Sequence, residues 1–174
     1  MAASHKFRPL KVDLSLKFAG ELAISHSARS ERSHTDRRGQ KMSETIESKN
    51  KALVLEAFDT LFNKRDYAAA ERYWSPNYIQ HSAHIAPGRD GLFNLIKSIP
   101  PTLKYEPGTI VAEKDFVIVH GRFSGFGQPV NWIAADIVRI KDGILIEHWD
   151  VIEDEATRES SKSGLPMFGE KFVG

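Results

Sequence analysis

The order of strand-like segments in the second half of the chain constrains its fold more than any other feature. Apolar residues recur in four stretches, which cover residues 104–112, 116–125, 130–140 and 144–152. Short polar or glycine-containing turns separate them, and the last turn contains Asp142-Gly143. Asp-Gly between two apolar runs is a strong hairpin signal. The pattern therefore predicts an antiparallel meander of four strands.

Three segments with helical patterns precede these strands. Apolar residues recur every three or four positions from Ser43, an N-cap candidate, to Phe62, which predicts an amphipathic helix. Asp66 is expected to cap a short second helix that reaches Trp74 and is ended by residues 75–77. A third helix is expected after Pro87-Gly88, and Pro100 ends it. Helices followed by antiparallel strands indicate an α+β domain, in which a pocket forms between a curved sheet and the helices.

The distribution of charge argues against nucleic-acid binding by the domain. Residues 1–41 carry nine Lys or Arg against four Asp or Glu, whereas the remainder carries 15 against 19. A slightly acidic domain lacks the basic surface that supplies most of the affinity for phosphates. No apolar run approaches the length of about 18 residues that crosses a bilayer, so we expect no membrane span. Cysteine is absent, which fits a reducing compartment, and we expect a cytoplasmic location.

The N-terminal extension is too polar to form a core of its own. Residues 25–40 contain a single apolar side chain, Ala28, and we therefore predict that residues 1–41 form a disordered basic extension. The alternation of apolar residues from Leu10 to Phe18 is also compatible with an edge strand, which is an alternative to disorder there. Organelle targeting, or a true start at Met42, also remains open. We assign the domain to residues 42–155, followed by a tail at 156–174 that packs on the domain or on a dimer.

Several blocks of sequence together resemble one known family. They are Asn63-Lys64-Arg65-Asp66, Tyr78-Ile79-Gln80-His81, Pro87-Gly88, and the strand–turn–strand of residues 136–151, which ends in Glu147-His148-Trp149-Asp150-Val151. These blocks resemble the SnoaL-like branch, of polyketide-cyclase and aldol-condensation type, of the nuclear-transport-factor-2-like superfamily. The resemblance covers about residues 49–151. It implies a cone-shaped α+β barrel, with three N-terminal helices packed against a curved, mostly antiparallel sheet.

The same resemblance implies aldol chemistry that uses an acidic residue as acid and base, without a metal or an organic cofactor. Carried over residue by residue, that acid is Asp136. It lies in an otherwise apolar strand, where an ionised carboxylate needs a partner or a raised pKa. In an alternative interpretation, Asp136 points outward or simply pairs with Arg122 or Arg139. Strand parity does not decide between the two.

Histidine and aromatic side chains supply the other candidate site residues. His148 and His120 lie on predicted strands, where either could face the cavity as a proton carrier or as a donor to an enolate oxygen. His81 is expected near the pocket entrance, and we rank it above His84. No histidine pair has the helical spacing of a zinc motif, so we expect no metal. A small apolar or aromatic carbonyl compound is the expected ligand, bound by Tyr78, Trp74, Phe93, Trp132 and Trp149, although aromatic residues also form cores.

Two functional classes follow from this sequence. The first is a cofactor-free enzyme that cyclises, isomerises or dehydrates a carbonyl substrate by enolisation. The second is a non-catalytic module of the same fold, which binds a small ligand or dimerises. We expect a homodimer in either case, because alternating strands such as residues 130–140 can bury a second face against another copy.

Overall fold

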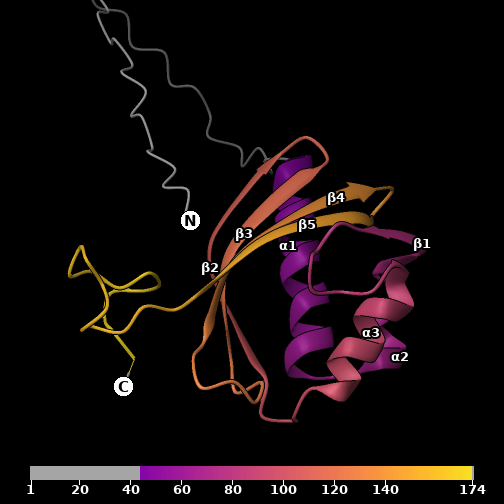
Figure 1. Cartoon of the computed structure of the whole chain (residues 1–174). Helices are drawn as coiled ribbons and strands as arrows, with labels where there is room; N and C mark the ends of the chain where they lie inside the picture. Colours follow the sequence, from indigo (N-terminus) through magenta and orange to yellow (C-terminus); the bar gives the residue numbers. More distant parts are fainter. Residues whose placement is uncertain (1–43, 174) are drawn as a thin grey trace, which may run out of the picture. The chain divides into compact units, whose positions relative to one another are not determined.

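A computed structural model describes residues 44–173, and Figure 1 shows how the elements of this domain are arranged. No helix in this part of the chain is long and apolar enough to cross a membrane. The basic extension, with its edge-strand and targeting alternatives, lies outside the described residues. The helices are α1 (Ile46–Phe58), a π-helix η1 (Asp59–Asn63), α2 (Tyr67–Ala70) and α3 (Gly88–Ser98). The strands are β1 (Trp74–Gln80), β2 (Lys104–Glu113), β3 (Phe116–Ser124), β4 (Trp132–Lys141) and β5 (Ile144–Asp154).

The five strands form one curved sheet in the order β1-β5-β4-β3-β2. Strands β2 to β5 are the predicted antiparallel meander, and β1 runs parallel to β5 at the edge. Asp142 and Gly143 both have positive φ values, 52° and 75°, as a tight two-residue hairpin turn requires. The sequence prediction of an α+β domain with a mostly antiparallel sheet is confirmed.

The first helix differs from its prediction at both ends. It begins at Ile46, and its N-cap is Thr45, whose Oγ1 accepts a hydrogen bond from the backbone N–H of Ser48 at 3.2 Å. The cap is therefore Thr45, and the candidate Ser43 lies outside the described residues. After Phe58 the chain continues as the wider π-helix η1. At its end the Asn63 side chain meets the backbone of Tyr105, accepting from its N–H at 2.8 Å and donating to its C=O at 3.1 Å. The π-helix η1 thus connects α1 to β2.

Trp74 lies in a strand, not in the second helix where the sequence pattern placed it. Asp66 caps α2 as predicted, but the helix ends at Ala70. Pairing with β5 then takes over, because the N–H of Leu145 donates to the C=O of Tyr73 at 2.8 Å and Trp74 pairs with Leu145. A four-residue helix has little stability of its own, so tertiary strand pairing overrides the local preference.

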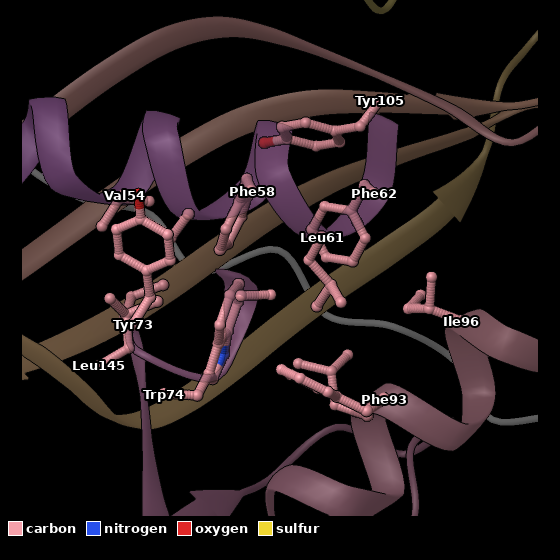
Figure 2. Close-up of a cluster of buried hydrophobic side chains, with 14 of the residues drawn as sticks. Val54, Phe58, Leu61, Phe62, Tyr73, Trp74, Phe93, Ile96, Tyr105 and Leu145 are labelled. Carbon is pink, nitrogen blue, oxygen red and sulfur yellow. The ribbon is translucent and has the colours of Figure 1, made fainter. Parts of the chain in front are cut away.

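Aromatic side chains form the core between the helices and the inner face of the sheet, which is the face that α1 and α3 cover (Figure 1). Figure 2 shows side chains of α1 and η1 directed toward residues from β1, α3 and β2. Phe58 meets Tyr105 edge-on at 5.4 Å between ring centroids, and Trp74 meets Phe93 at 5.7 Å. These contacts bury large apolar surfaces and hold the walls of the cavity described below.

Arg65 ties the end of α3 to the chain that follows η1. It has a left-handed backbone, with φ of 54°. Its guanidinium donates to three carbonyl groups at the end of α3, those of Ile96 at 2.5 Å, Ile99 at 3.0 Å and Pro100 at 2.9 Å. Carbonyl groups at a helix C-terminus lack intrahelical donors, and the guanidinium of Arg65 supplies the missing donors. Its conformation therefore fixes the position of α3.

The C-terminal tail packs on the outer face of the sheet, which is the face opposite α1 and α3. The guanidinium of Arg122 lies 4.6 Å from the ring centroid of Phe168 and pairs with Glu155 at 2.5 Å. A Cβ atom on Gly108 would come within 2.8 Å of the Phe168 ring, so glycine makes room for this contact. The tail is thus anchored to β2 and β3.

Candidate active site

The cavity lies between the inner face of the sheet and the helices. Three of the predicted ligand-binding residues line it, namely Trp74 and Tyr78 of β1 and Trp132 of β4. Most of the remaining wall is apolar and includes Phe58, Phe62, Leu92, Leu95, Ile96, Ile99, Phe123 and Phe126. Four residues bring titratable side chains to this wall besides Tyr78, namely His84, Asp136, His148 and Asp150. An apolar cavity with a few converging polar groups is the usual form of a small-molecule site.

Asp136 and His148 form a buried pair in this cavity. Asp136, on β4, is 4% exposed, and His148, on β5, is 5% exposed. The Nε2 atom of His148 lies 3.0 Å from Oδ1 of Asp136. Its burial in the cavity wall excludes the outward orientation that we considered for Asp136. The pairing with an arginine does not occur either, because Arg122 pairs with Glu155 and Arg139 with Glu147.

The surroundings of Asp136 keep its carboxyl protonated to a higher pH than usual. Burial raises the pKa of Asp136, the hydrogen bond and charge of His148 oppose that shift, and the neighbouring Asp150 raises the pKa further. The second oxygen, Oδ2, is buried and has no hydrogen-bond partner within residues 44–173. A carboxylate with a raised pKa and one unpartnered oxygen can accept a proton from a bound molecule.

Asp150 is a cavity residue that sequence reasoning missed. It lies two residues beyond His148 on the same strand and directly opposite Asp136 in the β4–β5 register. Two signals could have found it: the period-two alternation that places residues 148 and 150 on one face, and the Asp142-Gly143 turn, which fixes the register. Two carboxylates directly across a sheet repel each other, which accounts for the effect of Asp150 on the pKa of Asp136.

Three of the predicted site residues lie on the outer face and do not reach the cavity. His81 stacks on Trp149 with ring centroids 4.7 Å apart, and its Nε2 lies 2.9 Å from Glu147. His120 packs against Phe168 at 5.5 Å. The expectation that these side chains face the pocket is therefore not met. The reason is strand alternation: Gln80, His148 and Val119 point inward, so their neighbours in sequence point outward.

The ranking of the two loop histidines is reversed, because His84 lines the cavity and lies 5.6 Å from the Trp132 ring. Phe93 belongs to the core beneath the cavity, packed on Trp74, and is absent from its wall. Tyr78 does reach the cavity. Burial raises the pKa of its hydroxyl, so it stays neutral and can donate a hydrogen bond.

Asp136, His148 and Asp150 are also the residues of the described domain best placed to hold a metal ion. Their potential ligand atoms all lie within 4.8 Å of one another. Histidine and carboxylate groups are ligands for several divalent metals. The expectation of a metal-free site therefore stays a prediction, and metal analysis can test it.

Comparison with known proteins identifies the family. The sequence profile of the SnoaL-like domain matches residues 54–148, more than half of the chain. AclR of Streptomyces galilaeus, a candidate hydroxylase, shares 28% identity, with 61% of this chain and 90% of that chain covered and a TM-score of 0.50. A search of curated proteins found no match.

Two further solved structures have the same fold. A candidate ketosteroid isomerase of Kribbella flavida is 17% identical, with 74% of this chain and 98% of that chain covered and a TM-score of 0.59. A candidate SnoaL-like polyketide cyclase of Jannaschia is 22% identical, with 66% and 92% covered and a TM-score of 0.54. The family match and the architecture agree: this chain belongs to the SnoaL-like domain family.

Proposed function

We propose that this protein is a cofactor-free enzyme that enolises a small apolar or aromatic carbonyl compound, and so cyclises, isomerises or dehydrates it. The observation that supports this proposal is the buried Asp136–His148 pair, 3.0 Å apart, at the wall of an apolar cavity. Candidate polyketide cyclases and a candidate ketosteroid isomerase are among the proteins of the same fold. They support the reaction class, although fold alone does not define an activity.

In the proposed reaction Asp136 acts as the base. Its unpartnered Oδ2 takes a proton from the carbon next to the carbonyl, and the electron pair of that C–H bond moves to form an enolate. The neutral Tyr78 hydroxyl donates a hydrogen bond to the enolate oxygen. Asp136 then returns the proton, either to another carbon or to the alkoxide that forms when the enolate attacks a second carbonyl. His148 stabilises the change of charge on Asp136.

Deuterium exchange tests this proposal without knowledge of the natural substrate. A cyclic enone or an aromatic ketone such as 1-indanone is incubated in D₂O with the full-length protein, and loss of the proton signal next to the carbonyl is followed by NMR. We expect exchange above the buffer rate, and we expect Asp136→Asn to lower that rate by roughly a hundredfold or more. Asp142→Asn, an exposed substitution in the β4–β5 turn, is the matched control and should leave the rate unchanged.

Binding measurements separate this enzyme from the alternative binding module. Phenols resemble an enol in shape, and their phenolates carry the charge of an enolate. Their binding can be followed by the fluorescence of Trp74 and Trp132, which line the cavity. Exchange that depends on Asp136 supports the enzyme. Phenol binding with no exchange for any ketone, and equal affinity in Asp136→Asn, would instead identify a non-catalytic ligand-binding domain.

We also propose that the protein forms a homodimer through the outer face of the sheet. The register aligns Val111, Ile118, Ile137 and Trp149 across four strands, and Phe116 and Val151 flank them. Val151 is 69% exposed and Val111 52%. A contiguous apolar strip of this kind usually marks an interface, and a two-fold axis would place the strip against its own copy.

Sedimentation of the full-length protein tests the dimer. Ile118→Lys introduces a charge into the strip and should convert a dimer into a monomer. Leu165→Lys changes an equally apolar exposed side chain in the tail and should not. A wild-type monomer at micromolar concentration would contradict this proposal.

A further inference from the structure

We propose that Gln80 is a positioning residue that determines which ring nitrogen of His148 carries the hydrogen when the imidazole is neutral. This inference rests on the proposed acid–base function but concerns a residue outside it. Gln80 is the last residue of β1 and pairs directly with His148 in the parallel β1–β5 register. The next backbone N–H, that of His81, donates to the carbonyl of His148 at 2.9 Å. The backbones of the two residues are therefore held side by side.

The first step is the orientation of the Gln80 amide. Its Oε1 accepts a hydrogen bond from the backbone N–H of Ser82 at 3.0 Å. A backbone N–H can only donate, so the atom that it meets has to be the amide oxygen. In the flipped amide, NH₂ would face the N–H of Ser82. The amide nitrogen has no hydrogen-bond partner among residues 44–173, so its contacts do not compete with this orientation.

The second step is the tautomer of His148. The same Oε1 lies 2.8 Å from Nδ1 of His148. Because this oxygen only accepts, Nδ1 has to carry the hydrogen in that contact. The neutral imidazole then presents a lone pair at Nε2, which lies 3.0 Å from Oδ1 of Asp136. Asp136 and His148 therefore share one proton across this contact.

The third step connects the tautomer to the chemistry of the site. With Nδ1–H held by Gln80, Nε2 can hold the shared proton while Asp136 is ionised, and it keeps its hydrogen bond to Oδ1 when Oδ2 takes the proton of the substrate. In the other tautomer Nε2 carries a fixed hydrogen, and His148 can only donate to the carboxylate. Gln80 thus keeps His148 able to exchange a proton with Asp136.

Nitrogen-15 NMR of the histidine rings in the full-length protein tests this assignment directly. His148→Gln identifies the signals of His148 by their loss. In the wild type we expect neutral His148 to carry its hydrogen on Nδ1. Gln80→Leu removes the acceptor and should shift the population to the Nε2–H tautomer, whereas Gln80→Glu keeps an acceptor and should retain Nδ1–H. Gln128→Leu, in the exposed β3–β4 loop, is the control and should change nothing.

Spectra taken between about pH 5 and pH 9 span the range in which histidine ordinarily titrates. Nε2–H in the wild type, or His148 signals that Gln80→Leu leaves unchanged, would overturn the proposal. If Gln80→Leu does not fold, the wild type and Gln80→Glu still decide the matter, since both have to show Nδ1–H.

Deuterium exchange adds a kinetic readout that a purely structural role would not give. We expect Gln80→Leu to lower the exchange rate at least about tenfold, and Gln80→Glu to restore part of it with a displaced pH profile. The two proposals can fail separately. A wild-type protein without exchange but with Nδ1–H on His148 contradicts the proposed reaction alone, whereas exchange with the opposite tautomer contradicts the role of Gln80.

Discussion

Replacing the buried carboxyl of Asp136 by an amide should make the protein more stable at neutral pH while removing its proposed activity. The side chain is 4% exposed, and only one of its two oxygens has a partner in the described domain. Asn has nearly the same shape and can still contact Nε2 of His148. The substitution Asp136→Asn therefore removes a buried charge without opening a cavity.

The size of the gain follows from the incomplete pairing of the charge. Replacing a buried ion pair by apolar groups of similar volume is often neutral, or stabilising by about 1–4 kcal/mol, because removing charge from water is costly. Oδ1 keeps a hydrogen bond at 3.0 Å to His148, which offsets part of the cost of burial, whereas Oδ2 has no such compensation. We therefore expect a gain near the lower end, about 1 kcal/mol in the free energy of unfolding.

The gain should depend on pH in one direction only. Burial raises the folded-state pKa of Asp136 above its unfolded value, so the folded protein binds this proton more tightly. Its contribution to stability is present below the ordinary carboxyl pKa of about 3.9 and is lost as pH rises through the folded pKa. Wild type and Asp136→Asn should therefore be equally stable near pH 4, and the variant should be the more stable one above the folded pKa.

Urea denaturation at a series of pH values, with both proteins at the same concentration, measures this difference. Asp142→Asn is the control, because that carboxyl is exposed in the β4–β5 turn. The reasoning is refuted if Asp136→Asn is less stable than the wild type at pH 8, or if the difference is already complete at pH 4. Either result would mean that the folded protein favours the ionised carboxylate.

Two further predictions concern the walls of the cavity and its metal content. Arg65→Ala removes three charge-assisted hydrogen bonds to the end of α3 and should lower the free energy of unfolding by about 2 kcal/mol, as measured by urea denaturation. Lys64→Ala is the control, because the exposed ion pair of Lys64 with Asp59 contributes little to stability. Dialysis against EDTA should leave the deuterium-exchange rate unchanged; loss of exchange that zinc or manganese restores would instead assign a metal to Asp136, His148 and Asp150.

Local sequence signals were enough to place most of the elements. The Asp142-Gly143 turn fixed one hairpin, and alternation within residues 104–152 located β2 to β5 closely. Pro87-Gly88 and the prolines after residue 99 bounded α3. The first helix and Trp74 were misassigned because distant partners decide their conformation. Tyr105 binds the end of η1, and Leu145 pairs with Trp74.

The candidate site was only partly predictable. Asp136 stood out as the single acid in an apolar strand, and His148 was a candidate of equal rank with His120. Alternation alone could not say which face of each strand is buried, because shifting the whole pattern by one residue exchanges the two faces. Asp150 was overlooked although it shares the face of His148. His84 was ranked below His81 because it lies in a loop, where alternation gives no information.

The sequence by itself determined the class of fold, the family and the turns that set the register, because these depend on periodicity and on residues with special backbone conformations. Only the tertiary structure decided which titratable groups meet. The contact between Gln80, His148 and Asp136 joins three strands, and its proton arrangement depends on hydrogen bonds between residues up to 68 positions apart. Such contacts leave no local pattern in the sequence, since they follow from the pairing of β1 with β5.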